Sequence, residues 1–322
     1  MRAVWLRRFG GPEVLTVEET PDPVPGEGQV VVEAAAIGIT YVETQVRSGS
    51  APMPLPELPV IPGNGVAGTV VTAGPGADPA LVGQRVATTT GGSGGYAEKV
   101  AVDAALVIPI PDALDFREAV GLLNDGRTAL GIGRAVAPGP GDWVLIGAGG
   151  SGVGSLLIQV VKQTGARVVA AASSSPKLGL ALGRGADVVV DYTGPGWEKV
   201  VRDATGGAGV DIACDAAGGD LGRAAFELVR PGGRFIAFGA GCGTMTRIPE
   251  EDVAARGVTL VPMGAAFPSP AVMQQLSVEA LAEGAAGRLR PAVGQTFPLD
   301  RAADAHAAVG ARRTLGKTLL IP

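Results

Sequence analysis

A glycine-rich turn in the middle of the chain sets the strongest limit on its fold. The apolar run at residues 143–146 leads into GAGGSGVG, which holds five glycines, and an apolar stretch typical of a helix follows from about Ser155. Glycines let backbone N–H groups approach a pyrophosphate closely, and a helix start favours negative charge. The pattern predicts a dinucleotide-binding site, with a separate domain before it. The alternative is a ligand-free turn between strand and helix, but five glycines exceed what such a turn needs.

The register of the glycine motif stays open at this point. GxGxxG fits Gly147, Gly149 and Gly152, while a shifted register uses Ala148 and Gly154. We therefore expect the whole turn to contact the cofactor. Its candidate residues are Ala148, Gly149, Gly150, Ser151, Gly152 and Val153.

After the turn, strands and helices alternate. Strands are expected at 167–172, 188–191, 210–215, 234–239 and 258–263, with a turn at 231–233. Strands separated by single helices predict parallel crossovers and a doubly wound Rossmann sheet. The fold class is therefore α/β.

The first ~120 residues have a different, β-rich pattern. Strands are expected at 29–36 and 68–72 and from Tyr96 onward, and the prolines at 52, 54, 56, 59 and 62 predict an extended loop. The tail, with a helix at 302–309 and a strand at 317–321, is expected to return to this first domain.

The segment after the second strand indicates which nicotinamide cofactor binds. An NAD site usually places Asp or Glu there, about 20 residues after the glycine turn, to bond the ribose 2′-OH. This chain has AASSSPK at 171–177, with no acid. Ser173, Ser174 and Lys177 suit a 2′-phosphate, which a carboxylate would repel. The sequence predicts NADPH, although Ser174 also suits a helix cap and Lys177 a surface charge.

Charge and apolar patterning exclude several partners. The net charge is −5, and no basic stripe could neutralise the phosphates of a nucleic acid or of an anionic membrane. No run approaches the ~20 apolar residues of a membrane span, and the first residues lack a signal-peptide core. We therefore expect a cytoplasmic protein with a small-molecule substrate and neither nucleic-acid nor membrane partners.

The supply of metal ligands is equally limiting. The chain has one histidine, His306, and two cysteines, Cys214 and Cys242. A catalytic zinc needs three protein ligands and a structural zinc four. The sequence therefore predicts a protein without metal. His306, within AADAHAA, is expected on the surface of a C-terminal helix.

Nearly the whole chain resembles the zinc-free medium-chain dehydrogenase/reductases, above all the quinone oxidoreductases of the zeta-crystallin branch. The resemblance is carried by the opening RAVWLRRFGGPEVLTVEE, by GITYVETQVRSG at 38–49, and by LPVIPGNGVAGTVVTAGPGADPALVGQRVA at 58–87. It continues with GGYAEKVAV at 94–102 and FPLDRAADAHAAVGARRTLGKTLLIP at 297–322.

The resemblance implies two domains and a set of cofactor contacts. A GroES-like catalytic domain would comprise residues 1–120 and 264–322, and a Rossmann NADPH-binding domain residues 121–263. It also implies a homodimer, paired through the edge strand near Thr259. Lys177 matches the family's 2′-phosphate lysine. The further cofactor contacts implied by position are Thr128, Tyr192, Gly239, Gly241, Cys242 and Lys317.

Four positions depart from the family pattern. Thr40 stands where asparagine is common and Gln45 where tyrosine is common. Gly65 replaces a common acidic residue, and Ser151 replaces the third glycine of the turn. These departures bear on the substrate pocket, so a preference for benzoquinone does not follow from the resemblance.

Without zinc, alcohol oxidation lacks its Lewis acid. Hydride transfer to a quinone or an α,β-unsaturated carbonyl remains feasible, with hydrogen bonds to the developing oxyanion. The candidate catalytic residues are Tyr41, Thr40 and Gln45. Tyr41 could donate a proton or simply line the cleft. Two other hypotheses are an enoyl-thioester reductase of polyketide-type metabolism and a non-catalytic NADPH-binding protein.

A polar cluster near the expected domain junction has a simpler interpretation. Asn124, Asp125 and Arg127 lie close together in the sequence. We interpret them as part of an interdomain salt bridge in preference to a catalytic group.

Overall fold

The structure, a computed structural model, describes residues 1–51 and 53–322. It divides the chain into two units, the first made of residues 1–124 and 277–322 and the second of residues 125–276. The limits expected from the sequence, 121 and 263, lie earlier in each case. The observed boundary between residues 276 and 277 lies inside helix α10 (Pro270–Ala285).

The second unit is built on a parallel sheet of six strands in the order β10-β9-β8-β11-β12-β13. Its strands are β8 (Trp143–Gly147), β9 (Arg167–Ala172), β10 (Val188–Asp191), β11 (Val210–Asp215), β12 (Val229–Ala237) and β13 (Thr259–Leu260). Its helices are α3 (Asp125–Val136), α4 (Gly152–Gln163), α5 (Ser175–Gly183), α6 (Trp197–Ala204), α7 (Gly219–Glu227), α8 (Glu250–Arg256) and α9 (Met263–Ala266).

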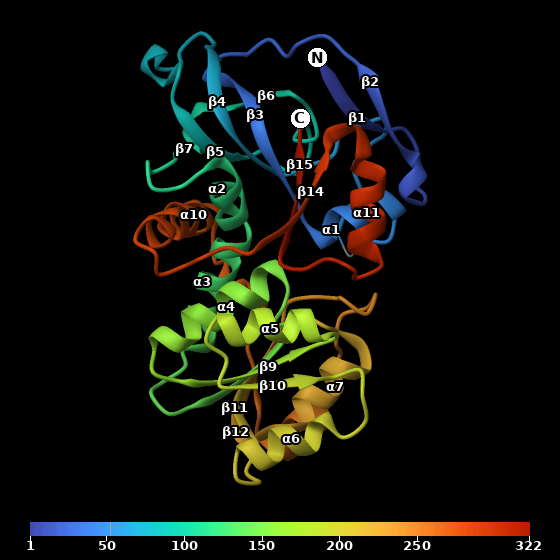
Figure 1. Cartoon of the computed structure of the whole chain (residues 1–322), viewed down its shortest axis with the longest axis vertical. Coiled ribbons are helices and arrows are strands. Elements are labelled where there is room, and N and C mark those ends of the chain that lie inside the picture. Colours follow the sequence, from blue (N-terminus) through green and yellow to red (C-terminus); the bar gives the residue numbers. More distant parts are fainter. Residues whose placement is uncertain (52) are drawn as a thin grey trace. The chain divides into compact units, whose positions relative to one another are not determined.

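Helices cover both faces of this sheet, with α4 and α5 on one face and α6 and α7 on the other (Figure 1). Strands buried on both faces read as continuous apolar runs, as in residues 168–172 and 212–214, which are buried throughout. The doubly wound Rossmann sheet expected from the alternation is confirmed, and its carboxyl edge, where ligands bind in such sheets, carries the glycine turn.

Three local expectations in this unit are wrong. The helix after the glycine turn begins at Gly152 and not near Ser155. The turn expected at 231–233 is absent, because β12 already begins at Val229 and runs through these residues with an irregular register against β11. The last strand, β13, has two residues, and Met263 already belongs to a helix.

The first unit contains a seven-stranded sheet in the order β14-β15-β3-β4-β5-β7, with β6 paired to β3, and a separate β1-β2 hairpin. Its strands are β1 (Arg2–Leu6), β2 (Leu15–Glu19), β3 (Gln29–Ile39), β4 (Gly65–Ala73), β5 (Arg85–Thr89), β6 (Lys99–Asp103), β7 (Ile108–Pro109), β14 (Val293–Pro298) and β15 (Lys317–Ile321). Its helices are α1 (Tyr41–Ser48), α2 (Phe116–Leu123) and α11 (Ala302–Gly310).

The C-terminal tail joins this sheet as expected, because β15 pairs with β3 and with β14. Residues 53–59 form neither helix nor strand, as their prolines predict, while Pro52 lies outside the described residues. Tyr96 does not begin a strand. It precedes β6 and is held by a hydrogen bond from the Val4 N–H to its carbonyl (2.9 Å).

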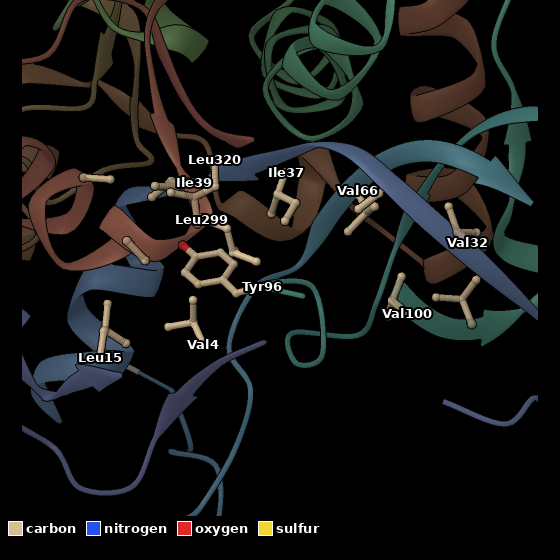
Figure 2. Close-up of a cluster of buried hydrophobic side chains, with 14 of the residues drawn as sticks. Val4, Leu15, Val32, Ile37, Ile39, Val66, Tyr96, Val100, Leu299 and Leu320 are labelled. Atoms are coloured by element: carbon tan, nitrogen blue, oxygen red, sulfur yellow. The ribbon is translucent and has the colours of Figure 1, made fainter. Parts of the chain in front are cut away.

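The core of this unit lies between the sheet, the hairpin and α11. Figure 2 shows Val4, Ile39, Leu299 and Leu320 near the ring of Tyr96, with Val32, Val66 and Val100 further along the same cluster. Tyr96 is fully buried, with Val4 and Leu299 among its neighbours in the cluster. A buried tyrosine hydroxyl needs a hydrogen-bond partner, so this core must contain polar groups as well.

Candidate active site

The glycine turn ends in a capped helix start. Ser151 is the N-cap of α4, and its hydroxyl oxygen accepts a hydrogen bond from the Gly154 N–H (3.0 Å). The N–H groups of Gly152 and Val153, in the first turn, have no acceptor within the helix and suit an anion. The serine that departs from the family's glycine therefore has a structural role as the cap.

Two glycines of the turn permit close packing. An ideal Cβ on Gly149 would lie 2.9 Å from the Cβ of Ala170 on β9. An ideal Cβ on Gly150 would lie 2.8 Å from the Cα of Lys177 on α5. Neither position has room for a side chain. The backbone of the turn is therefore pressed against the strand and helix that carry the serine and lysine cluster.

The predicted phosphate-binding residues gather beside this turn. The Lys177 ammonium donates a hydrogen bond to the Ser173 hydroxyl (3.2 Å). Ser174 is the N-cap residue of α5, but its side chain makes no capping hydrogen bond. Two hydroxyls, an ammonium and a helix start thus lie together, a combination that favours a phosphate dianion.

Tyr192 lies at the same edge of the sheet. It follows β10 directly, and its N–H donates to the carbonyl of Ala172 at the end of β9 (3.2 Å). This bond places Tyr192 beside the segment that begins at Ser173. The position is consistent with the cofactor contact of Tyr192 that the resemblance implies, at the adenosine end, and that contact stays a prediction.

The loop after β12 is fastened to the end of β11. The Gly241 N–H donates to the carbonyl of Ala216 (3.1 Å), and the Cys242 N–H donates to that of Ala217 (2.6 Å). Gly239, Gly241 and Cys242 therefore lie over the carboxyl end of β11, one strand away from the glycine turn. Their implied contact with the cofactor stays a prediction.

A buried carboxylate that the sequence reasoning missed organises this loop. Oδ1 of Asp215 accepts hydrogen bonds from the N–H groups of Ala217 (2.8 Å) and Gly218 (3.1 Å). Oδ2 accepts from the Thr246 hydroxyl (2.5 Å). Burial raises the pKa of Asp215, while these hydrogen bonds oppose the shift. The only sequence signal was an acid at the end of a buried strand.

The three candidate catalytic residues lie at one end of α1, in the first unit. Thr40 is the N-cap, Tyr41 is the first helical residue, and Gln45 lies one turn further on. All three are half-buried. The Tyr41 carbonyl accepts a bond from the Thr44 hydroxyl (2.6 Å), which holds the first turn. The structure brings them together on one helix, and their catalytic role stays a prediction.

Lys317 and Thr128 belong to different units. Lys317 is buried on β15, where its Cε would lie 3.2 Å from an ideal Cβ on Gly38. Its charge acts to lower the pKa of Glu43 on α1. Thr128 is half-buried on α3. The implied cofactor contacts of both residues stay predictions.

Of the polar cluster of Asn124, Asp125 and Arg127, the position of Asp125 is explained by local packing. An ideal Cβ on Gly152 would collide with the Asp125 carboxylate, so this acid lies against the start of α4. Burial lowers the pKa of Arg127, and Asp125 opposes that shift. The interdomain salt bridge stays a prediction.

Position 65 has a packing reason to be glycine. An ideal Cβ on Gly65 would lie 2.8 Å from Nδ2 of Asn124. A larger residue would displace that amide. The glycine at this position therefore leaves room for the Asn124 side chain.

The expectation for His306 is wrong. The residue is fully buried, because its helix, α11, packs against the core of the first unit and not only against solvent. Its Nε2 lies 2.9 Å from the Tyr96 hydroxyl oxygen. No periodicity signal marked this position, since α11 consists mostly of alanine.

Within the described residues, no group of His, Cys, Asp and Glu side chains is placed to hold a metal ion.

Comparison with known proteins decides the family. Residues 26–112 match the alcohol dehydrogenase GroES-like domain, and residues 152–283 match the zinc-binding dehydrogenase domain. The chain is 32% identical to a 2-haloacrylate reductase of Burkholderia sp, covering 99% of this chain and 98% of the relative. It is 31% identical to the quinone oxidoreductase of Pseudomonas aeruginosa, covering 100% and 99%. The chain belongs to the medium-chain dehydrogenase/reductase family.

The fold comparison agrees with this assignment. The Escherichia coli quinone oxidoreductase, solved in complex with NADPH, is 27% identical to this chain, with a TM-score of 0.91 and full coverage of both chains. The GroES-like and Rossmann architecture expected from the resemblance is confirmed. Among the described helices, none has the length and apolarity needed to cross a bilayer.

Proposed function

We propose that this medium-chain dehydrogenase/reductase is an NADPH-dependent reductase of quinones or α,β-unsaturated carbonyl compounds. The observation that carries the cofactor assignment is the approach of Gly150 to Lys177, with Lys177 bonded to Ser173. A turn that suits a pyrophosphate and a cation that suits a 2′-phosphate are thereby adjacent. The NADPH complex of the Escherichia coli relative supports this reading.

Bound NADPH supplies a hydride. The first turn of α4 would hold the pyrophosphate, and Ser173, Ser174 and Lys177 the 2′-phosphate. Thr40, Tyr41 and Gln45 would donate hydrogen bonds to the acceptor's carbonyl oxygen as negative charge develops there. Tyr41 would also deliver the proton that completes the reduction.

The acceptor class rests on the relatives and on chemistry. The names of the similar proteins specify 2-haloacrylate and quinone as substrates, both of them unsaturated and activated by a carbonyl or carboxylate group. Such acceptors need no Lewis acid, which suits a chain with one histidine and two cysteines. The homodimer and the cytoplasmic location remain predictions.

A substrate panel tests the proposal. The purified protein would receive NADPH or NADH with benzoquinones, enones, 2-chloroacrylate and an enoyl thioester. Turnover of a quinone, an enone or the haloacrylate with NADPH is expected. Exclusive use of the thioester would favour a thioester reductase. Tight NADPH binding without any turnover would favour a non-catalytic protein.

The role of Tyr41 has its own test. Tyr41→Phe removes the hydroxyl and keeps the ring, so a proton donor would lose most of its kcat while a packed aromatic would not. Full turnover by Tyr41→Phe would exclude proton donation.

A further inference from the structure

Helix α1 buries charged residues. Glu43 is 6% exposed and Arg47 is 8% exposed, and Thr44 is the other buried residue of this helix. A surface helix normally buries an apolar stripe, and buried charges are rare unless they are paired. The burial of these charged side chains on α1 therefore needs an explanation in their contacts.

Glu43 is surrounded by donors from three separate segments. Its Oε2 accepts from the Thr40 N–H (2.5 Å) and from the Tyr96 hydroxyl (3.3 Å). Its Oε1 accepts from the N–H of Asn64 (2.8 Å). A carboxylate matches three donors, whereas an amide would turn an NH₂ group toward at least one of them. The bond to Thr40 is local, but those to Asn64 and Tyr96 join α1 to remote parts of the chain.

Tyr96 extends the network to α11. Its hydroxyl lies 2.9 Å from Nε2 of His306, and the two rings meet edge to face with centroids 5.6 Å apart. Burial, with a smaller effect from Arg47, lowers the pKa of His306 to about 3, so the imidazole is neutral. If Nε2 carries the proton, His306 donates to Tyr96 and the Tyr96 hydroxyl proton remains for Glu43.

Two buried cations, Arg47 and Lys317, belong to this network, and Lys317 is the one that acts on the carboxylate of Glu43. Arg47 lies one turn after Glu43 on the same helix face, and burial lowers its pKa. Lys317 acts from β15 to lower the pKa of Glu43, although burial raises that pKa overall. Glu43 thus has hydrogen-bond donors and positive charge around it, and its carboxylate links three sequence segments.

We propose that Glu43 is a positioning residue, which with Tyr96 and His306 holds the start of α1 in place and thereby aims Thr40 and Tyr41 at the substrate. The inference rests on the proposed function only in its last step, the aim at a substrate. Misplacing catalytic groups by about 1 Å can cost a hundredfold in rate. The bonds from Glu43 to Asn64 and Tyr96 prevent such a shift.

Kinetics with the best acceptor provide the first test. Glu43→Gln and Tyr96→Phe are expected to lower kcat by about ten- to a hundredfold. The Kd of NADPH is expected to stay within about twofold, since Gly150 and Lys177 are untouched. The matched control is Thr88→Val, which removes a buried hydroxyl that bonds the carbonyls of Thr89 and Leu106, away from α1. Unchanged kcat in Glu43→Gln, or an equal loss in Thr88→Val, would overturn the proposal.

A second readout needs no substrate. The chain has three tyrosines, so 3-fluorotyrosine labelling gives three ¹⁹F resonances, which Tyr→Phe variants assign. Glu43→Gln and Tyr96→Phe are expected to shift or broaden the Tyr41 resonance and to leave that of Tyr192 alone, while Thr88→Val changes neither. If the wild type reduces no acceptor, the proposed function fails, but the positioning role is still decided. An unchanged Tyr41 resonance in both variants would refute it.

Discussion

Gly150 and Lys177 touch so closely that an ideal Cβ on the glycine would lie 2.8 Å from the Cα of the lysine. The contact joins the turn that precedes α4 to the first turn of α5. Both halves of the proposed cofactor site are thereby fixed relative to each other before any ligand binds. Such preorganisation reduces the ordering that binding requires.

Lys177→Ala is expected to weaken NADPH binding by about ten- to a hundredfold, since a hydrogen bond to a charged group contributes about 1.5–3 kcal/mol. NADH lacks the 2′-phosphate, so its affinity is expected to change little. Fluorescence titration of both cofactors measures the difference. Lys199→Ala is the matched control, because Lys199 forms an exposed pair with Asp203 on α6. An unchanged preference between the cofactors in Lys177→Ala would refute the assigned role.

Gly150→Ala is expected to lower both stability and NADPH affinity. The new methyl group would collide with Lys177, and overpacking of this kind costs about 1–3 kcal/mol. Urea unfolding and cofactor titration measure the two effects. Gly179→Ala on α5 is the control, since an ideal Cβ there meets nothing within 4 Å. That control is expected to raise stability by roughly 0.5–1 kcal/mol. Equal behaviour of the two variants would contradict the close packing.

Two substitutions at Asp215 distinguish the effect of its hydrogen bonds from the effect of its negative charge. Asp215→Ala removes the acceptor for three donors and is expected to destabilise the protein by about 3 kcal/mol and to weaken NADPH binding, since it releases the loop at Thr246. Asp215→Asn can still accept from Ala217 and Gly218, and its amide can donate to the Thr246 hydroxyl oxygen. Its NADPH affinity is expected to stay near that of the wild type. If the asparagine variant bound NADPH as weakly as the alanine variant, the carboxylate charge would be what matters.

The parts of the fold with a strong periodic pattern could be predicted from the sequence. Strands β9, β10 and β11 have the expected limits because each is a short apolar run bounded by polar or glycine residues. The start of α4 was predicted too late because the helix begins at Gly152, within the glycine-rich turn. The residue that caps it, Ser151, stands where the family has glycine. β12 continues past its glycines because Val229 and Arg234, on either side of them, both pair with β11, and such pairing with a neighbouring strand is a tertiary effect.

The residues proposed to bind the cofactor were easier to predict from the sequence than those around the candidate catalytic residues. Ser173, Ser174 and Lys177 are close in sequence, so a local motif could identify them. The position of the Glu43 carboxylate depends on hydrogen bonds from Asn64 and Tyr96, and the Tyr96 hydroxyl in turn is hydrogen-bonded to His306. Contacts over such sequence separations leave no pattern in a single sequence. An alanine-rich helix also hides which of its faces is buried, which is why His306 was misplaced.

His306 makes stability depend on pH in a defined window. Its folded pKa is about 3, below the ordinary value of 6.5, so between these values the unfolded chain binds the additional proton. Stability therefore falls as pH decreases from about 6.5 toward 3 and is fully present above 6.5. His306 is the sole histidine, so a proton-linked loss of stability between pH 6.5 and 5 reports this residue. Urea unfolding at several pH values measures the slope.

The control for this slope is His306→Asn, whose amide can still bond the Tyr96 hydroxyl but does not titrate. This variant is expected to be less stable at pH 7.5 because it fills less of the core, and to lose less stability than the wild type on acidification to pH 5. Glu43 and Asp215 have raised pKa values and act in the opposite direction, since protonation stabilises a buried carboxyl relative to its ionised form. Asp215 lies outside this network, and the asparagine amide can still donate to the Tyr96 hydroxyl so that Tyr96 donates to Glu43 as before. The difference between the two slopes therefore reports the imidazole. Parallel slopes for the wild type and His306→Asn would show that the pKa of His306 is not lowered in the folded protein.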